Sequence, residues 1–81
     1  MDIGIVKWFN NVKGFGFITS DVCEGDIFAH FSEIQAEGYR SLKVGQKVQF
    51  ELVQGERGAS ASNITPISEK RYNPSLIKLL L

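Results

Sequence analysis

The sequence predicts an all-β protein, a closed antiparallel barrel of five short strands. Two observations favour this fold class. Five stretches rich in β-branched and aromatic residues are separated by Gly, Asn and Asp turns, and no internal stretch has convincing helical periodicity. Short strands that follow one another mostly as hairpins commonly close into a barrel. The 81 residues suffice for one domain with a modest core, because chains of this size bury only about 60% of their unfolded surface.

Residues 3–10 (IGIVKWFN) and 13–20 (KGFGFITS) are the first two predicted strands. Side chains alternate between the two faces of a strand, so Phe15 and Phe17 point one way while the two glycines and Ile18 point the other. Ile18 requires burial, and glycine lets a neighbouring strand approach closely. That face is expected to be the core side, which leaves Phe15 and Phe17 on the outer face.

Residues 26–31 (DIFAHF) are the third predicted strand. By the same alternation, Ile27 and Ala29 are expected to face the core. Phe28 and His30 then share the outer face, next to the rings of the second strand.

The last two strands are predicted from residues 47–52 and 60–65. Val48, Phe50 and Leu52 alternate with polar residues, which is typical of a strand with one buried face, and the fifth strand turns Ile64 to the core. The predicted connections are a turn at 21–25, an irregular segment at 32–45 with one helical turn at 32–34, and a turn at 54–58.

Aromatic residues are concentrated in one part of the chain. Seven of the nine lie between residues 8 and 39, and so small a core has no room for them all. Several must be exposed, and a cluster of exposed rings usually marks a binding surface. The opposing interpretation is a cluster packed in the core. Alternation disfavours it, because Phe15, Phe17 and Phe28 lie opposite Ile18 and Ile27.

Composition excludes several classes of protein and site. Nine basic residues balance nine acidic ones, which argues against a domain held to nucleic acid by phosphate neutralisation alone. The single cysteine, Cys23, excludes an internal disulfide, and one Cys with one His cannot form a zinc site. The longest apolar run, Leu79–Leu81, is too short to span a bilayer. We therefore expect a cytoplasmic protein with no metal, no cofactor and no membrane partner.

Residues 13–18 (KGFGFI) match the start of the RNP1 pattern of RNA-binding sheets. Aromatic residues two apart on a strand project from one face at a separation that suits successive bases. The RNP2-like stretch, residues 27–31, follows RNP1 here, whereas an RNA-recognition motif has it first. That order rejects the RNA-recognition-motif fold.

The order of motifs resembles the bacterial cold-shock protein family. The matching residues are Gly4-x-Val6-Lys7-Trp8-Phe9-Asn10, Lys13-Gly14-Phe15-Gly16-Phe17-Ile18, Asp26-Ile27-Phe28-Ala29-His30-Phe31-Ser32, Gly45-Gln46-x-Val48-x-Phe50 and Ala61-x-Asn63. The resemblance covers about residues 1–67. Residues 34–35, 38–43 and 45–50 are similar to the D-type subgroup of that family.

This resemblance implies an OB-fold barrel that binds single-stranded DNA and RNA on its aromatic face, with no cofactor and no small-molecule substrate. It implies two alternative roles, an RNA chaperone or a coat on single-stranded DNA that inhibits replication. The base-stacking residues that it implies are Trp8, Phe15, Phe17, Phe28, His30, Phe31 and Tyr39. Supporting backbone or base-edge contacts map to Lys7, Asn10, Lys13, Asp26 and Arg57. Ala29 and Ala59 depart from the valine and proline usual in the family, and neither is a stacking residue.

Two other classes of function compete with this interpretation. An enzyme is disfavoured, because the lone His30 has no recognisable Ser or Cys nucleophile and Asp26 is its only nearby carboxylate in the sequence. A protein-interaction module with an aromatic groove for proline-rich peptides is the alternative function. Lys7 and Lys13 could be ordinary solvated charges, but their places beside the rings favour phosphate contact. For Arg57 the two interpretations are balanced, because a Glu-Arg-Gly turn is common in any hairpin.

The domain is expected to cover residues 1–67, with residues 68–81 as a C-terminal extension. Asn73-Pro74 is typical of a helix start, and the seven residues after it are mostly apolar. A helix of that length is marginal on its own in water. Three alternatives stay open: a frayed tail, docking on the barrel, or docking on a partner that supports a homodimer.

Overall fold

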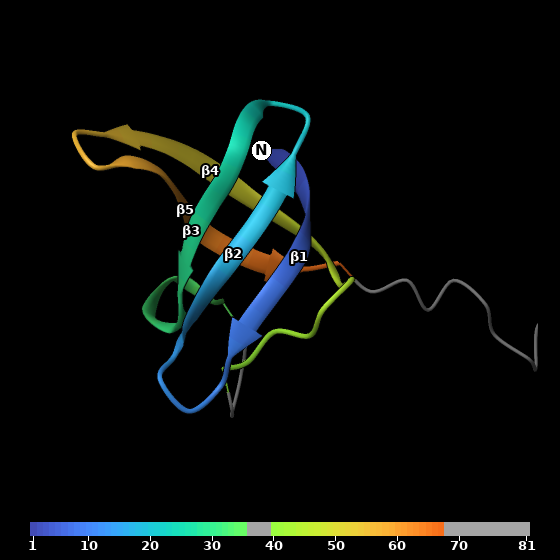
Figure 1. The fold of residues 1–81 in the computed structure, drawn as a ribbon. Helices are drawn as coiled ribbons and strands as arrows, with labels where there is room; N and C mark the ends of the chain where they lie inside the picture. The colour runs from blue at the N-terminus through green and yellow to red at the C-terminus, as the bar shows by residue number, and fades with distance from the viewer. Residues whose placement is uncertain (36–39, 68–81) are drawn as a thin grey trace, which may run out of the picture.

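The computed structural model describes residues 1–35 and 40–67. Within them the chain forms five strands and one short 3₁₀ helix (Figure 1): β1 Asp2–Asn10, β2 Phe15–Ser20, β3 Cys23–His30, η1 Phe31–Glu33, β4 Lys47–Gly55 and β5 Gly58–Pro66. The five-stranded all-β prediction is confirmed. The predictions for Tyr39 and for the extension 68–81 fall outside the described residues.

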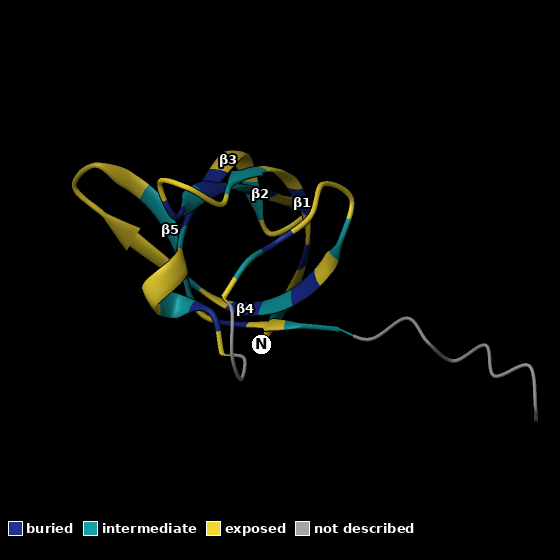
Figure 2. Cartoon of the chain, turned by 90° about the horizontal axis from the view of Figure 1, so that it is seen from below, coloured by how far each residue is buried: buried dark blue, intermediate teal, exposed yellow. Residues whose placement is uncertain are grey.

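The strands close into a barrel in the order β1-β2-β3-β5-β4, and Figure 2 shows them surrounding a common interior. β1, β2 and β3 form an antiparallel meander, β4 and β5 form a hairpin, and β4 pairs antiparallel with β1. The closing pair, β3 with β5, is parallel and is recorded at Phe28 opposite Ser60. This closed five-stranded arrangement is consistent with the OB-fold that the sequence resemblance implies.

The predicted boundaries are wrong in four places. Lys13 and Gly14 belong to the β1–β2 turn and not to the second strand, because Gly14 has a φ of +80°, a turn conformation that glycine favours. The predicted turn at 21–25 shrinks to residues 21–22, since Cys23 already pairs with Ser20. The predicted turn at 54–58 likewise shrinks to residues 56–57. The helical turn is shifted by one residue, from 32–34 to 31–33.

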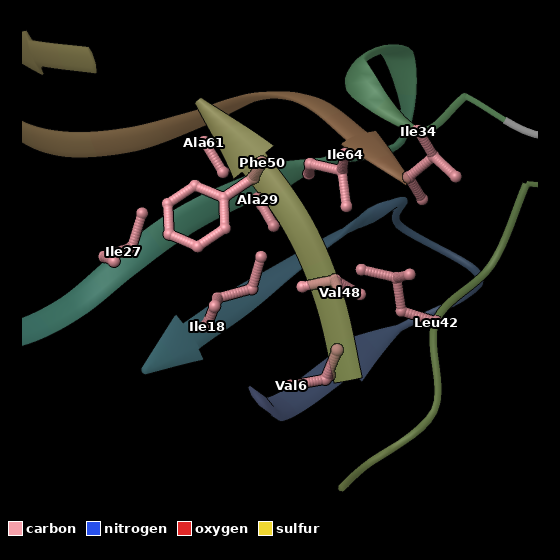
Figure 3. Packing of buried hydrophobic residues seen from close by; sticks show 10 residues of the cluster. All are labelled: Val6, Ile18, Ile27, Ala29, Ile34, Leu42, Val48, Phe50, Ala61 and Ile64. Atoms are coloured by element: carbon pink, nitrogen blue, oxygen red, sulfur yellow. The ribbon is translucent and has the colours of Figure 1, made fainter. Parts of the chain in front are cut away.

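Among the described residues, the core contains ten buried hydrophobic side chains (Figure 3): Val6, Ile18, Ile27, Ala29, Ile34, Leu42, Val48, Phe50, Ala61 and Ile64. Every strand contributes, and Ile34 and Leu42 come from the connection between η1 and β4. The inward positions predicted by alternation are confirmed, with Leu52 half-buried against the cluster. Burial of each large aliphatic or aromatic side chain stabilises the fold by about 1.5–3 kcal/mol. Among the described aromatic residues only Phe50 is fully buried, so the other rings lie nearer the surface.

A bulge in β1 decides which way Trp8 points. Val6 lies opposite Ile18, and Trp8 lies opposite Phe17, so Lys7 is an extra residue without an opposite partner in β2. Strict alternation would send Trp8 inward with Val6. The inserted residue reverses this, and both Lys7 and Trp8 are exposed while Phe9 packs against the core.

Gly16 makes room for this arrangement on the inner face. It lies opposite Phe9, and a Cβ at residue 16 would collide with the carbonyl oxygen of Trp8 and come within 2.6 Å of the Phe9 Cα. Only glycine therefore lets β1 and β2 approach closely enough behind the outward rings.

Two kinds of feature are absent from the described residues. No helix within residues 1–35 and 40–67 has the length and apolar character needed to cross a membrane. The same residues contain no group of three or more His, Cys, Asp or Glu side chains placed to hold a metal ion.

Candidate nucleic-acid interface

A continuous row of rings covers the outer face of β1, β2 and β3 and runs on to η1. We call it the aromatic platform, and its described members are Trp8, Phe15, Phe17, Phe28, His30 and Phe31. Strand register sets the row, because Phe17 lies opposite both Trp8 and Phe28. Phe15 lies opposite His30 in the same way. Residues from three strands thus meet on one face.

Neighbouring rings of the platform contact one another, mostly at tilted or edge-on angles. The Trp8 centroid lies 5.7 Å from that of Phe15 and 5.5 Å from that of Phe17. Phe28 lies 6.0 Å from Phe15 and 5.9 Å from Phe17. The row continues from Phe28 to His30 at 6.3 Å and from His30 to Phe31 at 4.7 Å. Such pairs contribute about 0.5–1.5 kcal/mol each beyond their burial, which holds the rings in place.

The platform is open to solvent. Trp8 and Phe28 are each 38% exposed and Phe31 is 43% exposed. Phe15, Phe17 and His30 are half-buried, and none of the six belongs to the buried core. The interpretation of these residues as a core-packed cluster is therefore wrong, and the predicted outward orientation is confirmed.

The β1–β2 turn fixes one end of the platform. Asn10 Oδ1 accepts hydrogen bonds from the backbone N–H groups of Val12 and Lys13, at 3.0 and 2.9 Å. The Gly14 carbonyl accepts from the Phe31 N–H at 2.8 Å, and a Cβ on Gly14 would lie 2.6 Å from the Phe31 ring. Phe31 therefore packs on the bare face of Gly14. Asn10 was predicted to support a ligand, and its side-chain oxygen also shapes the turn.

His30 joins the platform to η1. As the residue that caps η1, it accepts a hydrogen bond at Nδ1 from the Ser32 backbone N–H, at 3.2 Å. Ser32 Oγ lies 2.8 Å from the same nitrogen. With Nδ1 accepting, the neutral imidazole carries its proton on Nε2, and that N–H is the ring's donor.

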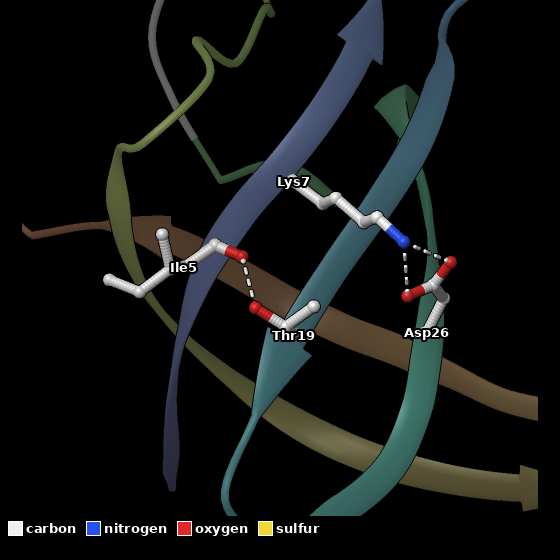
Figure 4. Close-up of polar contacts among 4 residues, drawn as sticks. All are labelled: Ile5, Lys7, Thr19 and Asp26. Atoms are coloured by element: carbon white, nitrogen blue, oxygen red, sulfur yellow. Dashed lines mark hydrogen bonds and ion pairs between the residues drawn. The ribbon is translucent and has the colours of Figure 1, made fainter.

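An ion pair crosses the outer face of β2 (Figure 4). Lys7 Nζ on β1 lies 3.2 Å from Asp26 Oδ1 and 3.1 Å from Oδ2 on β3. Beside it, Thr19 Oγ1 donates to the Ile5 carbonyl at 3.4 Å. Lys7 and Asp26 were each predicted to support a ligand, and the structure pairs them with each other. Their side chains are 53% and 38% exposed, so the pair contributes little to stability, about 0–1 kcal/mol.

Arg57 lies in the exposed turn between β4 and β5. This turn and the platform enclose a groove of about 760 Å³ that is lined by Arg57, Asp26, Phe17 and Phe28, among others. The structure thus brings Arg57 to the edge of the platform. Lys13 is exposed in the β1–β2 turn, next to the Asn10 hydrogen bonds.

Sequence reasoning missed a second hollow beside the platform. We call it the η1 pocket, a space of about 340 Å³ lined by Phe28, His30, Ser32, Glu33, Val53, Ser60, Ala61 and Ser62. Its residues come from the end of β3, from η1 and from the β4–β5 hairpin. No local pattern in the sequence joins these segments, so only the closure of the barrel reveals the pocket.

Comparison with known proteins gives consistent matches. The family described as 'Cold-shock' DNA-binding domain matches residues 2–67. The chain is 59% identical over 69 residues to cold shock-like protein CspD of Haemophilus influenzae, an alignment that covers 85% of this chain and 96% of that protein. It is 58% identical over 67 residues to the CspD of Escherichia coli K12, covering 83% and 90% of the two chains.

A relative that is not a CspD protein and a solved structure also match the chain. Cold shock protein ScoF of Streptomyces coelicolor is 56% identical over 66 residues, which cover 82% of this chain and 98% of that one. The solved structure drosophila Unr CSD456 superimposes with a TM-score of 0.70 at 21% identity and covers 89% of this chain and 29% of that one, a likeness of fold. Together with the barrel and its ring-covered face, these matches show that the chain belongs to the cold-shock domain family.

Proposed function

We propose that the protein binds single-stranded DNA and RNA by stacking unpaired bases on the aromatic platform, with little sequence specificity. The observation that carries this proposal is the continuous, solvent-open row of six rings across β1, β2, β3 and η1. Every nucleobase has a flat π-face, so a row of rings accepts any sequence. A duplex hides those faces in its own stack, and a single strand exposes them. The activity is binding, with no covalent step.

Stacking is expected to supply most of the affinity. It contributes about 1–3 kcal/mol per base, so three or four engaged rings outweigh a few phosphate contacts. The chain has zero net charge, and Lys7 is already paired with Asp26. The proposed stacking residues are the six platform rings and Tyr39, which lies outside the described residues. The proposed supporting contacts are Lys7, Asn10, Lys13, Asp26 and Arg57.

Two cellular roles are compatible with this binding mode. The protein would act as an RNA chaperone that melts weak hairpins, or as a coat on single-stranded DNA that slows replication. The proposal includes a cytoplasmic location, because that is where a bacterium holds its DNA and RNA. Isolating the nucleic acid that co-purifies with the chain from growing and from starved cells separates the roles. RNA in growing cells supports the first, and single-stranded DNA in starved cells supports the second.

Fluorescence of Trp8 tests the binding proposal, because Trp8 is the only tryptophan and lies on the platform. A thymine-rich single strand should quench it in a saturable titration. A duplex of the same length and a proline-rich peptide are the controls, and neither should quench it. Equal quenching by the duplex would contradict the proposal. Quenching by the peptide alone would support the peptide-binding alternative.

A homodimer is a separate proposal that rests on the extension 68–81. Five of its last six residues are apolar, and a second copy of the chain could cover them. Sedimentation of the full chain should then give a dimer, whereas a chain that ends at Glu69 should sediment as a monomer. Identical sedimentation of the two forms as monomers would refute it.

A further inference from the structure

The η1 pocket lies against the platform, where Phe28 and His30 form part of its wall, and its lining combines apolar surface with a few hydrogen-bonding groups. Three serine hydroxyls (Ser32, Ser60 and Ser62) and the Glu33 carboxylate provide hydrogen-bonding groups, and Val53 and Ala61 provide apolar surface. No Lys or Arg is among the described residues that line it. A pocket with a carboxylate and no cation repels phosphate, so it fits a neutral group with hydrogen-bond donors.

Glu33 is held in a fixed position at the end of η1. Its Oε1 accepts a hydrogen bond from Ser62 Oγ at 3.0 Å and one from the Asn63 backbone N–H at 3.3 Å. Asn63 has a φ of 50°, a conformation uncommon for a residue with a side chain, and the second bond helps to hold it there. Next to it Ile34 forms a bridge with Ile64, which ties η1 to β5.

The second carboxylate oxygen of Glu33 is the one available to a ligand. Both hydrogen bonds recorded for this side chain within the described residues end on Oε1. Glu33 is half-buried, so a bond made there is partly shielded from water. A carboxylate oxygen only accepts hydrogen bonds, and among nucleobase edges it favours an amino group over a carbonyl.

We propose that the η1 pocket reads one base of the bound strand and prefers cytosine to thymine or uracil, with Glu33 accepting from the cytosine N4 amino group. The two kinds of pyrimidine stack alike on Phe28 or His30, but cytosine presents a donor at the position where thymine and uracil present the O4 acceptor. This inference rests on the proposed function, because a base reaches the pocket only from the platform. The other platform positions stay tolerant of sequence.

The test compares dC and dT oligomers of equal length on the full chain, by Trp8 quenching, in the wild-type protein and in Glu33→Gln. Glutamine can keep an acceptor oxygen for Ser62 and Asn63 while it turns an N–H₂ donor to the pocket, which suits O4 of thymine. Uniform oligomers remove any ambiguity of register, and differences in stacking cancel when the two proteins are compared. The dC-to-dT affinity ratio should fall about tenfold in Glu33→Gln.

Glu24→Gln is the matched control, because it removes the same charge from an exposed position on β3. It should change the affinities for both oligomers alike and leave their ratio unchanged. A second measurement needs no variant. Oligomers of 2-pyrimidinone deoxynucleotides, which lack the N4 amino group of cytosine, should bind the wild-type protein about tenfold more weakly than dC.

The outcomes separate this inference from the function on which it rests. If neither dC nor dT binds the wild-type protein, the proposed function itself fails. If both bind and the ratio is the same in Glu33→Gln, the pocket does not read the base and the inference is overturned. Equal affinity for dC and for the 2-pyrimidinone oligomer overturns it as well, whatever the fold of the variant.

Discussion

Trp8 lies opposite Phe17 on the outer face of the sheet, although Val6, two residues earlier in β1, lies opposite Ile18 on the inner face. Lys7 is an extra residue between these two pairs. It shifts the register by one residue, so that Val6 faces inward and Trp8 faces outward. The bulge adds a ring from β1 to those of β2 and β3, and it also turns the Lys7 side chain outward, towards Asp26. One irregularity of register therefore shapes both the aromatic platform and the charge beside it.

Removing a platform ring should weaken binding and leave the fold almost intact. In Phe28→Ala we expect affinity for a thymine-rich single strand to fall roughly ten- to hundredfold, the loss of one stacked base. Because Phe28 is 38% exposed, the thermal midpoint should fall less than for a core ring, by the loss of its contacts with Phe15 and Phe17. Phe50→Ala is the matched control, and it should lose about 3–5 kcal/mol of stability, since Phe50 is fully buried. Trp8 titration and thermal melting measure the two effects. A large drop in the melting temperature of Phe28→Ala would show that this ring supports the core.

Affinity for single strands should depend only weakly on salt. If Lys13 and Arg57 make the phosphate contacts, the logarithm of the binding constant should fall with the logarithm of salt concentration at a slope of about −1.4. A titration repeated at several salt concentrations gives the slope. A slope near −4 or steeper would mean that phosphate neutralisation dominates, contrary to the stacking mechanism.

The Lys7–Asp26 ion pair should couple only weakly. A double-mutant cycle with Lys7→Met and Asp26→Asn, measured by denaturant unfolding, should give an interaction of about 0–1 kcal/mol at low salt, because both side chains are well exposed. In 1 M salt the interaction should almost vanish, since screening then acts within about 3 Å. An interaction of several kcal/mol that persists in high salt would indicate a desolvated pair.

Gly16 should not tolerate even a methyl group. Gly16→Ala would push its Cβ against the backbone of Trp8 and Phe9, which cannot move without disturbing the β1–β2 pair. We expect a loss of about 1–3 kcal/mol of stability in a denaturant melt. Gly55→Ala is the control, because its Cβ would meet nothing closer than 3.6 Å and its stability should hardly change. Equal stability of the two variants would disprove the tight approach of the strands.

Asn10 should act on stability through its oxygen. Asn10→Ala leaves the Val12 and Lys13 N–H groups without their acceptor and should cost about 1–2 kcal/mol. Asn10→Asp keeps an acceptor oxygen and should restore most of that stability. Thermal melting of both variants measures this.

Alternation along single strands was enough to predict the barrel and the outward rings of β2 and β3, because inside and outside follow directly from a period of two. Phe15, Phe17 and Phe28 were placed on the outer face in this way, and Ile18 and Ile27 on the inner face. The orientation of Trp8 could not be predicted in this way. A bulge in β1 interrupts the two-residue alternation, and its position depends on how β1 pairs with β2.

Contacts between distant segments were beyond a local pattern. The Lys7–Asp26 pair joins residues 19 apart in the sequence, and the bonds from Ser62 and Asn63 to Glu33 span about 30 residues. The parallel pairing of β3 with β5 likewise becomes visible only when the barrel closes. The groove beside Arg57 and the η1 pocket both form where segments meet on closure of the barrel. For this reason the η1 pocket had no counterpart in the sequence-based prediction.

That closing pair has a consequence for motion. In the strand pairing, the seam between β3 and β5 is recorded at one position, Phe28 opposite Ser60, whereas every other seam of the barrel is paired at four positions or more. Local opening of the barrel is expected to start where backbone pairing is sparsest. A nucleotide stacked on Phe28 would then stabilise the pairing of β3 with β5. Backbone amide hydrogens of β3 and β5 near Phe28 and Ser60 should therefore exchange more slowly when a single strand is bound than in the free protein.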